Sequence, residues 1–437
     1  MNHQYQKNEI SDLRNQFLAN GFASARPCYV KKASGALLWD SQDREYLDFA
    51  GGIAVMNVGH SHPRVVGAVK AQADQFMHTC FMVLPYESTV TLAQKLCHLV
   101  PGSFEKKAMF VNSGAEAVEN AVKFARYYTQ KTGIISFESG FHGRTLMGMS
   151  LTSKVKPYKL GFGPFAPEIY RIPFAYCYRC PFGKEYPSCD LACASHLEEF
   201  LISHVAPETT AALIAEPIPG EGGYMVPPPE YFPKLKSICE AHGILFIADE
   251  IQTGIGRTGT MFAMEHWNIE ADITTTAKSL AAGMPLSAVV GRKEIMDAVH
   301  PGGIGGTYGA NPVAVEAALA VLEVMEEDRL LEAGKKIGEQ LTSGLRSLEN
   351  EFDLIGEVRG LGPMVAMELV KDKTSKTPAP EETKAVTDFC FEQGLIILAC
   401  GTFGNVIRFM MPLVTTAEQI NTGLDILSRA LQHVTGK

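Results

Sequence analysis

The segment from Ile244 to Pro285 limits the possible folds more than any other part of the chain. It opens with five consecutive apolar residues at 244–248, directly before Asp249. Such a run predicts a strand that is buried on both faces of a parallel sheet. A second, β-branched run at 272–277 predicts another strand and leads directly into Lys278. The sequence therefore predicts an α/β fold in which an acid and a lysine follow two strands.

The residues that end these two strands have complementary chemistry. Ligands of open α/β sheets bind beyond the carboxyl ends of the strands, which is where Asp249 stands. Lys278 is the only charged residue between Asp272 and Arg292, and a desolvated lysine has a lowered pKa and can act as a nucleophile. A solvated surface lysine is the simpler alternative. A lysine that forms a Schiff base and a carboxylate that keeps a pyridinium nitrogen protonated together suit pyridoxal phosphate.

Composition excludes several classes of protein. The 437 residues suffice for two or three domains, and a net charge of −9 argues against nucleic acid or an anionic membrane as the main partner. No apolar stretch approaches the roughly 20 residues of a membrane span. The first 21 residues are polar and of mixed charge, unlike a secretory signal or a transit peptide. Ten scattered cysteines fit a reducing compartment, so the expected location is the cytoplasm.

A phosphate site is predicted at residues 108–121. A short apolar run at 108–111 is followed by Ser113, Gly114 and Ala115, which open a helical pattern. A helix that starts directly after a strand presents unpaired N–H groups and the positive end of its dipole to an anion. An ordinary helix cap is the alternative, because serine and glycine are common at caps.

Another strand end, after residues 134–137, is followed by Phe141, His142 and Arg144. An aromatic ring in such a place can stack on a flat cofactor ring, and an arginine can hold a carboxylate with two hydrogen bonds. A core phenylalanine and a structural histidine are the alternatives.

These separated motifs resemble the class III pyridoxal-phosphate aminotransferases of the ω-aminotransferase group. They are DEIQTGIGRTG at 249–259 with Lys278 downstream, SGAEA at 113–117 and FHGR at 141–144. The likeness is greatest to 4-aminobutyrate aminotransferases and extends from about Arg26 to about Leu431. It implies an α/β protein of fold type I, with a large doubly wound, mostly parallel sheet domain and a smaller C-terminal α/β domain. The expected units are an N-terminal segment at 1–60 that packs with the small domain, a large cofactor-binding domain at 61–315, and the small domain at 316–437.

The resemblance also implies how pyridoxal phosphate is held. Lys278 carries the cofactor and acts as general base and acid, and Asp249 makes the ring an electron sink. Thr307 reaches the cofactor phosphate of a neighbouring subunit, which implies a homodimer or a dimer of dimers. The other implied cofactor contacts are Ser113, Gly114, Ala115, Phe141, His142, Glu216, Ile251 and Gln252.

The implied substrate contacts are Ile53, Met82, Arg144, Glu221 and Arg408. Arg144 holds the carboxylate of an ω-amino acid. Glu221 pairs with Arg408 and swings away when a dicarboxylate needs that arginine. A solvated loop glutamate is the alternative for Glu221. Met82 departs from the family pattern, because 4-aminobutyrate aminotransferases tend to have glutamine there.

The expected reaction transfers the amino group of an ω-amino acid, most of all 4-aminobutyrate, to 2-oxoglutarate, giving a semialdehyde and glutamate. The residues Ile53, Met82 and Arg144 do not separate chain lengths. 5-Aminovalerate, ornithine, acetylornithine and other ω-amines therefore stay open as donors, and pyruvate as acceptor. An amino-acid racemase or epimerase on the same scaffold is a further alternative, which the Glu221–Arg408 pair disfavours. A non-catalytic scaffold is disfavoured by the intact lysine, aspartate and phosphate motifs.

Four cysteines are clustered in a predicted loop at 176–193. Cys177 and Cys180 form a C-x2-C motif, and Cys189 and Cys193 form a C-x3-C motif. Four thiolates can bind Zn²⁺ or an iron–sulfur cluster, and four reduced cysteines in a surface loop are the alternative. Some animal relatives carry a cluster on a C-x2-C motif that precedes the H-G-R motif, so their cluster does not transfer to these later cysteines. No metal is assigned to the active site, and any metal in this loop would be structural.

Overall fold

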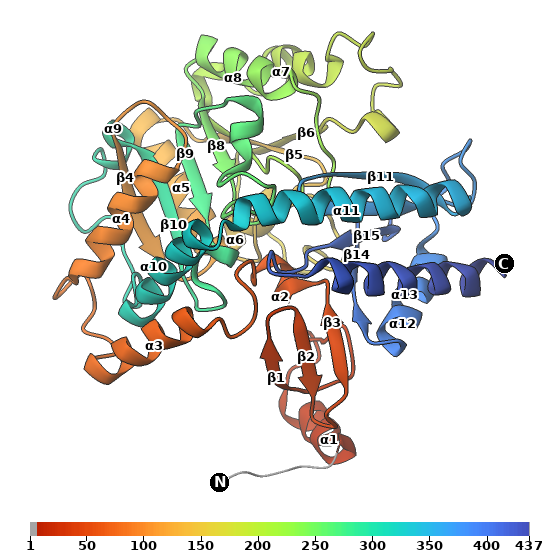
Figure 1. Cartoon of the computed structure of the whole chain (residues 1–437). Helices are drawn as coiled ribbons and strands as arrows, with labels where there is room; N and C mark the ends of the chain where they lie inside the picture. The colour runs from red at the N-terminus through yellow and green to blue at the C-terminus, as the bar shows by residue number, and fades with distance from the viewer. Residues whose placement is uncertain (1–6, 437) are drawn as a thin grey trace.

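A computed structural model describes residues 7–436, and its largest element is a seven-stranded sheet (Figure 1). The strands are β4 (Lys106–Val111), β5 (Gly133–Phe137), β6 (Ile169–Ile172), β7 (Thr210–Ala215), β8 (Leu245–Asp249), β9 (Ile273–Thr276) and β10 (Ser287–Arg292). Their order is β4-β10-β9-β8-β7-β5-β6. Neighbours are parallel except that β10 runs antiparallel to both β9 and β4. The prediction of a large, mostly parallel sheet is confirmed.

The two strands predicted first lie side by side at the centre of this sheet. The apolar run at 244–248 supplies most of β8, and the run at 272–277 contains β9. Asp249 stands opposite Thr275 in the register of the pair. Because the strands are parallel, the segments that follow them, including Lys278, leave from the same edge of the sheet.

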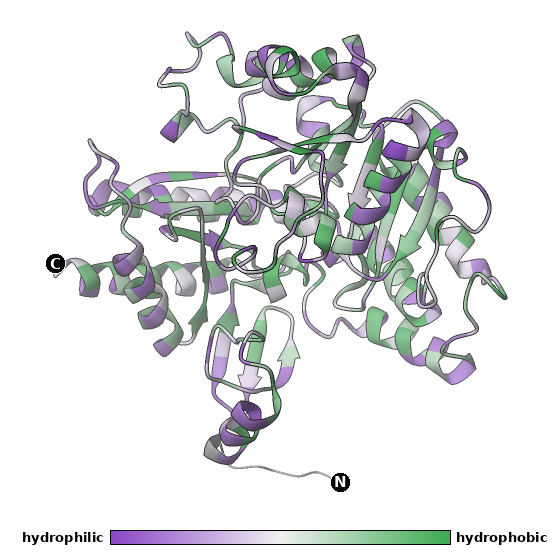
Figure 2. Ribbon diagram, turned by 180° about the vertical axis from the view of Figure 1, so that it is seen from behind, coloured by the Kyte–Doolittle hydropathy of each residue, from purple (hydrophilic) through white to green (hydrophobic). Residues whose placement is uncertain are grey.

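Helices cover both faces of the large sheet because successive strand residues point to opposite sides. Ile134, Ile214 and Ile247 pack in one core with α5 (Gly114–Thr129). The residues that follow them, Ile135, Ala215 and Ala248, point to the other face. They pack in a second core with α7 (Ala192–Ser203) and α8 (Tyr231–Ala241). Hydropathy follows this arrangement in Figure 2, where apolar residues dominate the strands and polar residues lie on the outer sides of the helices.

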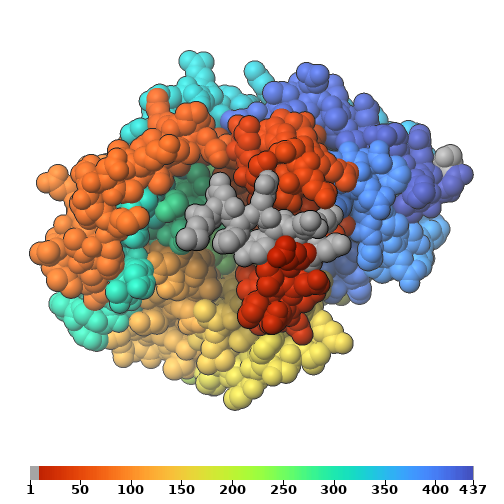
Figure 3. Space-filling view, turned by 90° about the horizontal axis from the view of Figure 1, so that it is seen from below, coloured from red at the N-terminus to blue at the C-terminus, as the bar shows by residue number. Residues whose placement is uncertain are grey.

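The C-terminal part contains an antiparallel sheet in the order β11-β12-β15-β14. The helices and strands of this C-terminal part are α11 (Leu330–Glu351), β11 (Ile355–Leu361), β12 (Met364–Leu369), α12 (Pro380–Glu392), β13 (Leu395–Ile396), β14 (Leu398–Cys400), β15 (Val406–Phe409) and α13 (Ala417–Thr435). The strand β13 instead joins the N-terminal strands β1 (Val30–Ser34), β2 (Leu37–Asp40) and β3 (Glu45–Asp48), pairing in parallel with β3. In Figure 3 the described N-terminal residues accordingly lie beside the blue C-terminal residues. This pairing supports the expected packing of segment 1–60 with the small domain, while the domain boundaries stay a prediction.

The remaining helices join these sheets. They are α1 (Lys7–Phe17), α2 (Gly51–Ala54), α3 (Pro63–Gln75), α4 (Glu87–Leu99), α6 (Leu146–Leu151), α9 (Lys293–Met296) and α10 (Pro312–Glu327), with short 3-10 helices η1 (Cys177–Arg179), η2 (Pro207–Thr209), η3 (Ala263–Trp267) and η4 (Lys278–Ala281). The spacing of Ile10, Leu13, Phe17 and Leu18 predicts a helix over residues 1 to about 25. The helix α1 is shorter and ends at Phe17, which is exposed together with Leu18, so burial of an apolar face does not stabilise a longer helix. The predicted residues 1–6 of that helix lie outside the described part. Within the described part, no helix has the length and apolar character needed to cross a membrane.

Candidate active site

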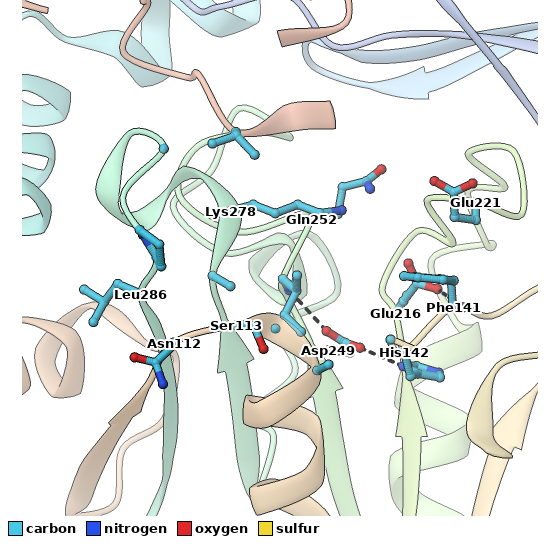
Figure 4. A pocket seen from close by; sticks show the side chains of 18 of the residues that line it. Asn112, Ser113, Phe141, His142, Glu216, Glu221, Asp249, Gln252, Lys278 and Leu286 are labelled. Atoms are coloured by element: carbon cyan, nitrogen blue, oxygen red, sulfur yellow. Dashed lines mark hydrogen bonds and ion pairs between the residues drawn. The ribbon is translucent and has the colours of Figure 1, made fainter. Parts of the chain in front are cut away.

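A cavity of about 310 Å³ lies at the carboxyl edge of the large sheet (Figure 4). It brings together residues that come from five strand ends and from the start of α5. Of the predicted residues, it is lined by Ser113, Gly114, Ala115, Phe141, His142, Glu216, Glu221, Asp249, Ile251, Gln252 and Lys278. These include every predicted cofactor contact except Thr307.

Lys278 extends into this cavity from the chain just beyond β9 (Figure 4). Its backbone has φ +39°, in the left-handed region that a residue with a Cβ seldom adopts, as is common for strained residues at functional sites. Burial and then the nearby positive charge of Arg408 lower the pKa of Lys278 to about 8, although Glu221 and two other carboxylates oppose the shift. A larger fraction of this amine is therefore unprotonated near neutral pH than in an ordinary lysine.

Asp249 is held by donors at both carboxylate oxygens. His142 Nδ1 lies 2.6 Å from Oδ2, and Oδ1 accepts hydrogen bonds from the Thr275 hydroxyl at 3.1 Å and the Ile251 N–H at 3.2 Å. Burial alone would lower the pKa of His142, but the hydrogen bond and charge of Asp249 outweigh burial and raise it. The carboxylate is thus fixed in orientation at the floor of the cavity, where it suits a protonated ring nitrogen.

The start of α5 forms an anion cradle as well as a capped helix. Ser113 Oγ accepts from the N–H of Glu116 at 3.3 Å, and the Glu116 carboxylate accepts from the N–H groups of Asn112 and Ser113 at 2.9 and 2.8 Å. The Ser113 side chain therefore caps the helix as an acceptor, and its predicted contact with the phosphate stays a prediction. Gly114 and Ala115 nevertheless line the cavity, and none of the described residues accepts a hydrogen bond from their N–H groups. Two free N–H groups at a helix start fit a phosphate.

Two glycines allow Ile251 and Gln252 to approach the cavity. A Cβ on Gly114 would lie 2.9 Å from Cδ1 of Ile251, and one on Gly220 would lie 2.4 Å from Oε1 of Gln252. The same Oε1 atom is buried and has no hydrogen-bond partner among the described residues. A buried amide oxygen that accepts no hydrogen bond costs free energy of folding. A bound ligand that donates a hydrogen bond to this oxygen would remove that cost. The cavity as a whole therefore fits pyridoxal phosphate.

Glu216 connects two strand-end loops around the cavity. Its carboxylate accepts from the N–H of Phe141 at 2.7 Å and from the N–H of Gly220 at 2.9 Å. Burial raises the pKa of Glu216 to about 7. These bonds fix the backbone that carries the Phe141 ring and the backbone against which Gln252 packs.

Glu221 and Arg408 form an ion pair close enough to Lys278 for both charges to affect its pKa. Arg408 Nη1 lies 2.6 Å from Glu221 Oε1 and also donates to the carbonyl of Gly220 at 3.2 Å. Arg408 is almost completely buried on β15, while Glu221 lines the cavity, so the pair joins the small sheet to the site. The alternative of a solvated loop glutamate is excluded by this contact.

The structure places five predicted residues outside the cavity lining, namely Arg408, which reaches the cavity only through Glu221, and four exposed residues. Ile53 is about half exposed at φ +65°, and Arg144 is exposed beside the ring of Tyr158. Met82 is exposed and packs on Gly305, where a Cβ would lie 2.3 Å from its sulfur. Thr307 lies on an exposed loop. The structure shows where the predicted site residues lie, and the roles assigned to them, including these, stay predictions.

Several residues of the site were not predicted from the sequence. Val55 and Asn112 line the cavity, Thr275 donates to Asp249, and Tyr158 donates to Glu221 at 2.9 Å. A signal existed for Thr275, because it occupies the β-branched strand next to the one that ends in Asp249. Tyr158 lies in an irregular segment without periodicity, so no sequence signal pointed to it.

The four clustered cysteines are free thiols. Cys177 begins η1, Cys193 lies in the first turn of α7, and Cys180 and Cys189 are partly buried between them. Burial and the neighbouring thiols Cys189 and Cys180 raise the pKa of Cys177. Among the described residues, no group of three or more histidine, cysteine or acidic side chains is placed to hold a metal ion.

Residues 20–431 match the family Aminotransferase class-III. This chain is a class III aminotransferase. The match spans nearly the whole chain and includes every residue that lines the cavity.

Relatives of this class III aminotransferase carry related names. A protein of Bacillus subtilis named "Probable 4-aminobutyrate aminotransferase" is 49% identical over 96% of this chain and 96% of its own length. The 5-aminovalerate aminotransferase DavT of Pseudomonas putida is 47% identical over 95% of this chain and 96% of its own length. The crystal structure of a Bacillus anthracis aminotransferase superposes with a TM-score of 0.92 at 30% identity, covering 98% of this chain and 99% of that one.

The predicted aminotransferase family and fold type I are thereby confirmed for this class III aminotransferase. Class III aminotransferases in general depend on pyridoxal phosphate. The family match does not by itself exclude a non-catalytic scaffold on a dead transaminase fold, but the presence of Lys278 and Asp249 in one cavity disfavours that alternative.

Proposed function

We propose that this class III aminotransferase binds pyridoxal phosphate in the cavity and transfers the amino group of an ω-amino acid to 2-oxoglutarate. The observation that carries the proposal is that Lys278, with its lowered pKa, shares one buried cavity with Asp249. 4-Aminobutyrate is the first candidate donor, because the 49% identical relative is named for it. 5-Aminovalerate is the second, because a 47% identical relative is named for that substrate.

In this proposal some residues of the protein bind the cofactor, and Lys278 transfers protons. The N–H groups of Gly114 and Ala115 hold the cofactor phosphate, and Asp249 holds the ring nitrogen. When bound, pyridoxal phosphate supplies a carbonyl that takes up amino groups and a ring that draws electrons from the substrate. Lys278 Nζ would move a proton from the substrate carbon that bears the nitrogen to the cofactor in one half of the reaction, and in the reverse direction in the other half. Phe141 covers one side of the cavity and helps to exclude water.

Two arginines recognise the substrates in this proposal. Arg144 has no ion pair with any carboxylate among residues 7–436, so its guanidinium is available for the carboxylate of an ω-amino acid. Arg408 is neutralised by Glu221 while the monocarboxylate is bound. When 2-oxoglutarate binds, Glu221 leaves and Arg408 receives the second carboxylate.

A homodimer or a dimer of dimers is part of the proposal. Thr307 lies on an exposed loop, where it is able to meet a neighbouring subunit. Large apolar side chains are exposed around that loop, namely Met77, Met82, Val83, Leu84 and Tyr308. Such a group of exposed apolar side chains is typical of a protein interface. The proposed location is the cytoplasm, which agrees with ten free cysteines.

A donor and acceptor panel tests the proposed function. The purified protein, loaded with pyridoxal phosphate, is offered 4-aminobutyrate, 5-aminovalerate, ornithine, acetylornithine and alanine, each with 2-oxoglutarate or pyruvate. We expect glutamate to form fastest with 4-aminobutyrate or 5-aminovalerate and 2-oxoglutarate. Racemisation without amino transfer, or transfer from α-amino acids only, would refute the proposal.

A further inference from the structure

Tyr158 makes a contact with the site that the proposed function does not use. It lies between α6 and β6 and is largely buried. Its hydroxyl donates to Oε2 of Glu221 at 2.9 Å, while Arg408 Nη1 lies 2.6 Å from Oε1. Each oxygen of the Glu221 carboxylate therefore has its own donor in the position that covers Arg408.

The ring of Tyr158 contacts two further residues of the site. Its centroid lies 4.8 Å from that of Phe141 at an interplanar angle of 58°. The guanidinium carbon of Arg144 lies 4.7 Å from the same ring, within the range of a cation–π contact. Tyr158 thus connects the arginine expected to bind the monocarboxylate with the glutamate expected to move for the dicarboxylate.

The hydrogen bond to Glu221 joins a neutral donor to a charged acceptor. Burial and the charge of Glu221 raise the pKa of Tyr158 far above its ordinary value, so the hydroxyl keeps its proton. Burial would raise the pKa of Glu221, but Arg408 and the hydrogen bonds outweigh burial and lower it. An O–H···O⁻ bond of this kind is stronger than a bond between neutral groups.

We propose that Tyr158 is a positioning residue that latches Glu221 onto Arg408 and so sets the balance between monocarboxylate and dicarboxylate substrates. The inference rests on the proposed function, in which Glu221 releases Arg408. We call the arrangement in which Glu221 pairs with Arg408 closed and the one in which Glu221 has left Arg408 open. Glu221 must break its hydrogen bond to Tyr158 to reach the open arrangement. Loss of the hydroxyl therefore shifts the closed–open equilibrium toward the open arrangement by about tenfold. A ligand that needs the open arrangement gains that factor, and one that uses the closed arrangement does not.

The variant Tyr158→Phe tests the latch because it removes the hydroxyl and keeps the ring. Binding to the holoenzyme is measured by calorimetry with glutarate, a dicarboxylate, and butyrate, a monocarboxylate, neither of which can react. We expect glutarate to bind about tenfold more tightly than to the unchanged enzyme and butyrate to bind no more tightly. The KM for 2-oxoglutarate should fall relative to the KM for the amine. Tyr170→Phe is the matched control, because it removes a hydroxyl that donates to the exposed Glu168 at 2.8 Å.

Two comparisons separate the latch from a general structural role of the Tyr158 hydroxyl. In a Glu221→Ala background no carboxylate remains to be held, so adding Tyr158→Phe should leave the ratio of glutarate to butyrate affinity unchanged. Equal changes for both ligands in Tyr158→Phe, or an unchanged ratio, would overturn the latch while leaving the proposed function intact. If the unchanged enzyme transfers no amino group to 2-oxoglutarate, the proposed function itself fails, and the latch fails with it.

Discussion

Burial shifts the pKa values of single ionisable residues in this site. Lys278 loses water and sits near Arg408, so its pKa falls, whereas Glu216 loses water and its pKa rises to about 7. Both shifts favour the neutral form, as desolvation requires. The lysine and aspartate were identifiable from the sequence because each follows a clear strand. The direction of the Lys278 shift was also expected, from the uncharged residues around it.

The pH dependence of cofactor uptake follows from the Lys278 pKa. The unprotonated fraction of this amine rises as pH increases through about 8, instead of through 10.5 for an ordinary lysine. We therefore expect covalent uptake of pyridoxal phosphate by the cofactor-free protein to speed up from pH 6.5 and to level off above about pH 8.5. Stopped-flow absorbance measures this rate. A rate that rises only above pH 10 would contradict the lowered pKa.

Two neighbouring threonines on β9 give a matched pair of variants. Thr275 donates to Asp249 Oδ1 at 3.1 Å, whereas the buried hydroxyl of Thr276 has no partner among the described residues. Thr275→Val should cost about 1 to 3 kcal/mol of stability and weaken cofactor binding, because a buried carboxylate loses a donor. Thr276→Val should leave both quantities unchanged or improved. Urea unfolding and the Kd for pyridoxal phosphate distinguish these outcomes, and equal losses in the two variants would count against the Asp249 contact.

At the scale of elements, apolar runs predicted strands well but predicted their pairing poorly. The sequence pattern predicts helices at 63–75 and 87–99, and α3 and α4 have these bounds because periodicity and first-turn residues are local signals. The strand β13 has only two residues and pairs with β3, almost 350 positions earlier in the chain. Such a pairing depends on the packing of whole units, so no local pattern indicates it.

Close packing of α11 on the turn between β11 and β12 gives a test at this scale. A Cβ on Gly338 would lie 2.1 Å from the carbonyl oxygen of Gly362, and one on Gly362 would lie 2.5 Å from that of Thr258, within the motif that follows Asp249. Gly338→Ala should therefore destabilise the protein by about 1 to 3 kcal/mol. Gly67→Ala, at an exposed position of α3 with nothing within 4 Å, should stabilise it by about 0.5 to 1 kcal/mol. Urea unfolding of both variants is the measurement, and destabilisation by Gly67→Ala alone would contradict this packing.

For the whole molecule, the sequence predicted the fold, the location of most of the cofactor site and the Glu221–Arg408 pair, but not the contacts of Tyr158 with this pair. The cofactor residues follow strands or open a helix, and such positions are visible as motifs. Tyr158 comes from an irregular segment, and its contacts with Phe141, Arg144 and Glu221 arise only when three parts of the chain meet. Ile53 and Met82 likewise depend on how their loops fold, and neither lines the cavity.

Association of subunits is expected through the exposed apolar side chains around Thr307. The segment that carries Met77 is fixed beside this loop by a hydrogen bond from Asn311 to the Met77 carbonyl at 3.2 Å. Leu84→Asp should shift the protein toward monomers and weaken cofactor binding, because a charge opposes burial in an interface. Ile202→Asp, at an exposed apolar position on α7, should leave the mass unchanged. Sedimentation velocity checks both, and a monomeric unchanged protein would contradict the dimer.

The most direct test of the central claim is chemical labelling of the lysine. The enzyme loaded with pyridoxal phosphate is reduced with borohydride, digested and analysed by mass spectrometry, with Lys278→Ala as the control. The account predicts a phosphopyridoxyl group on the peptide that contains Lys278, and none on any peptide of the variant. A label on another lysine, or retention of the label in Lys278→Ala, would contradict it.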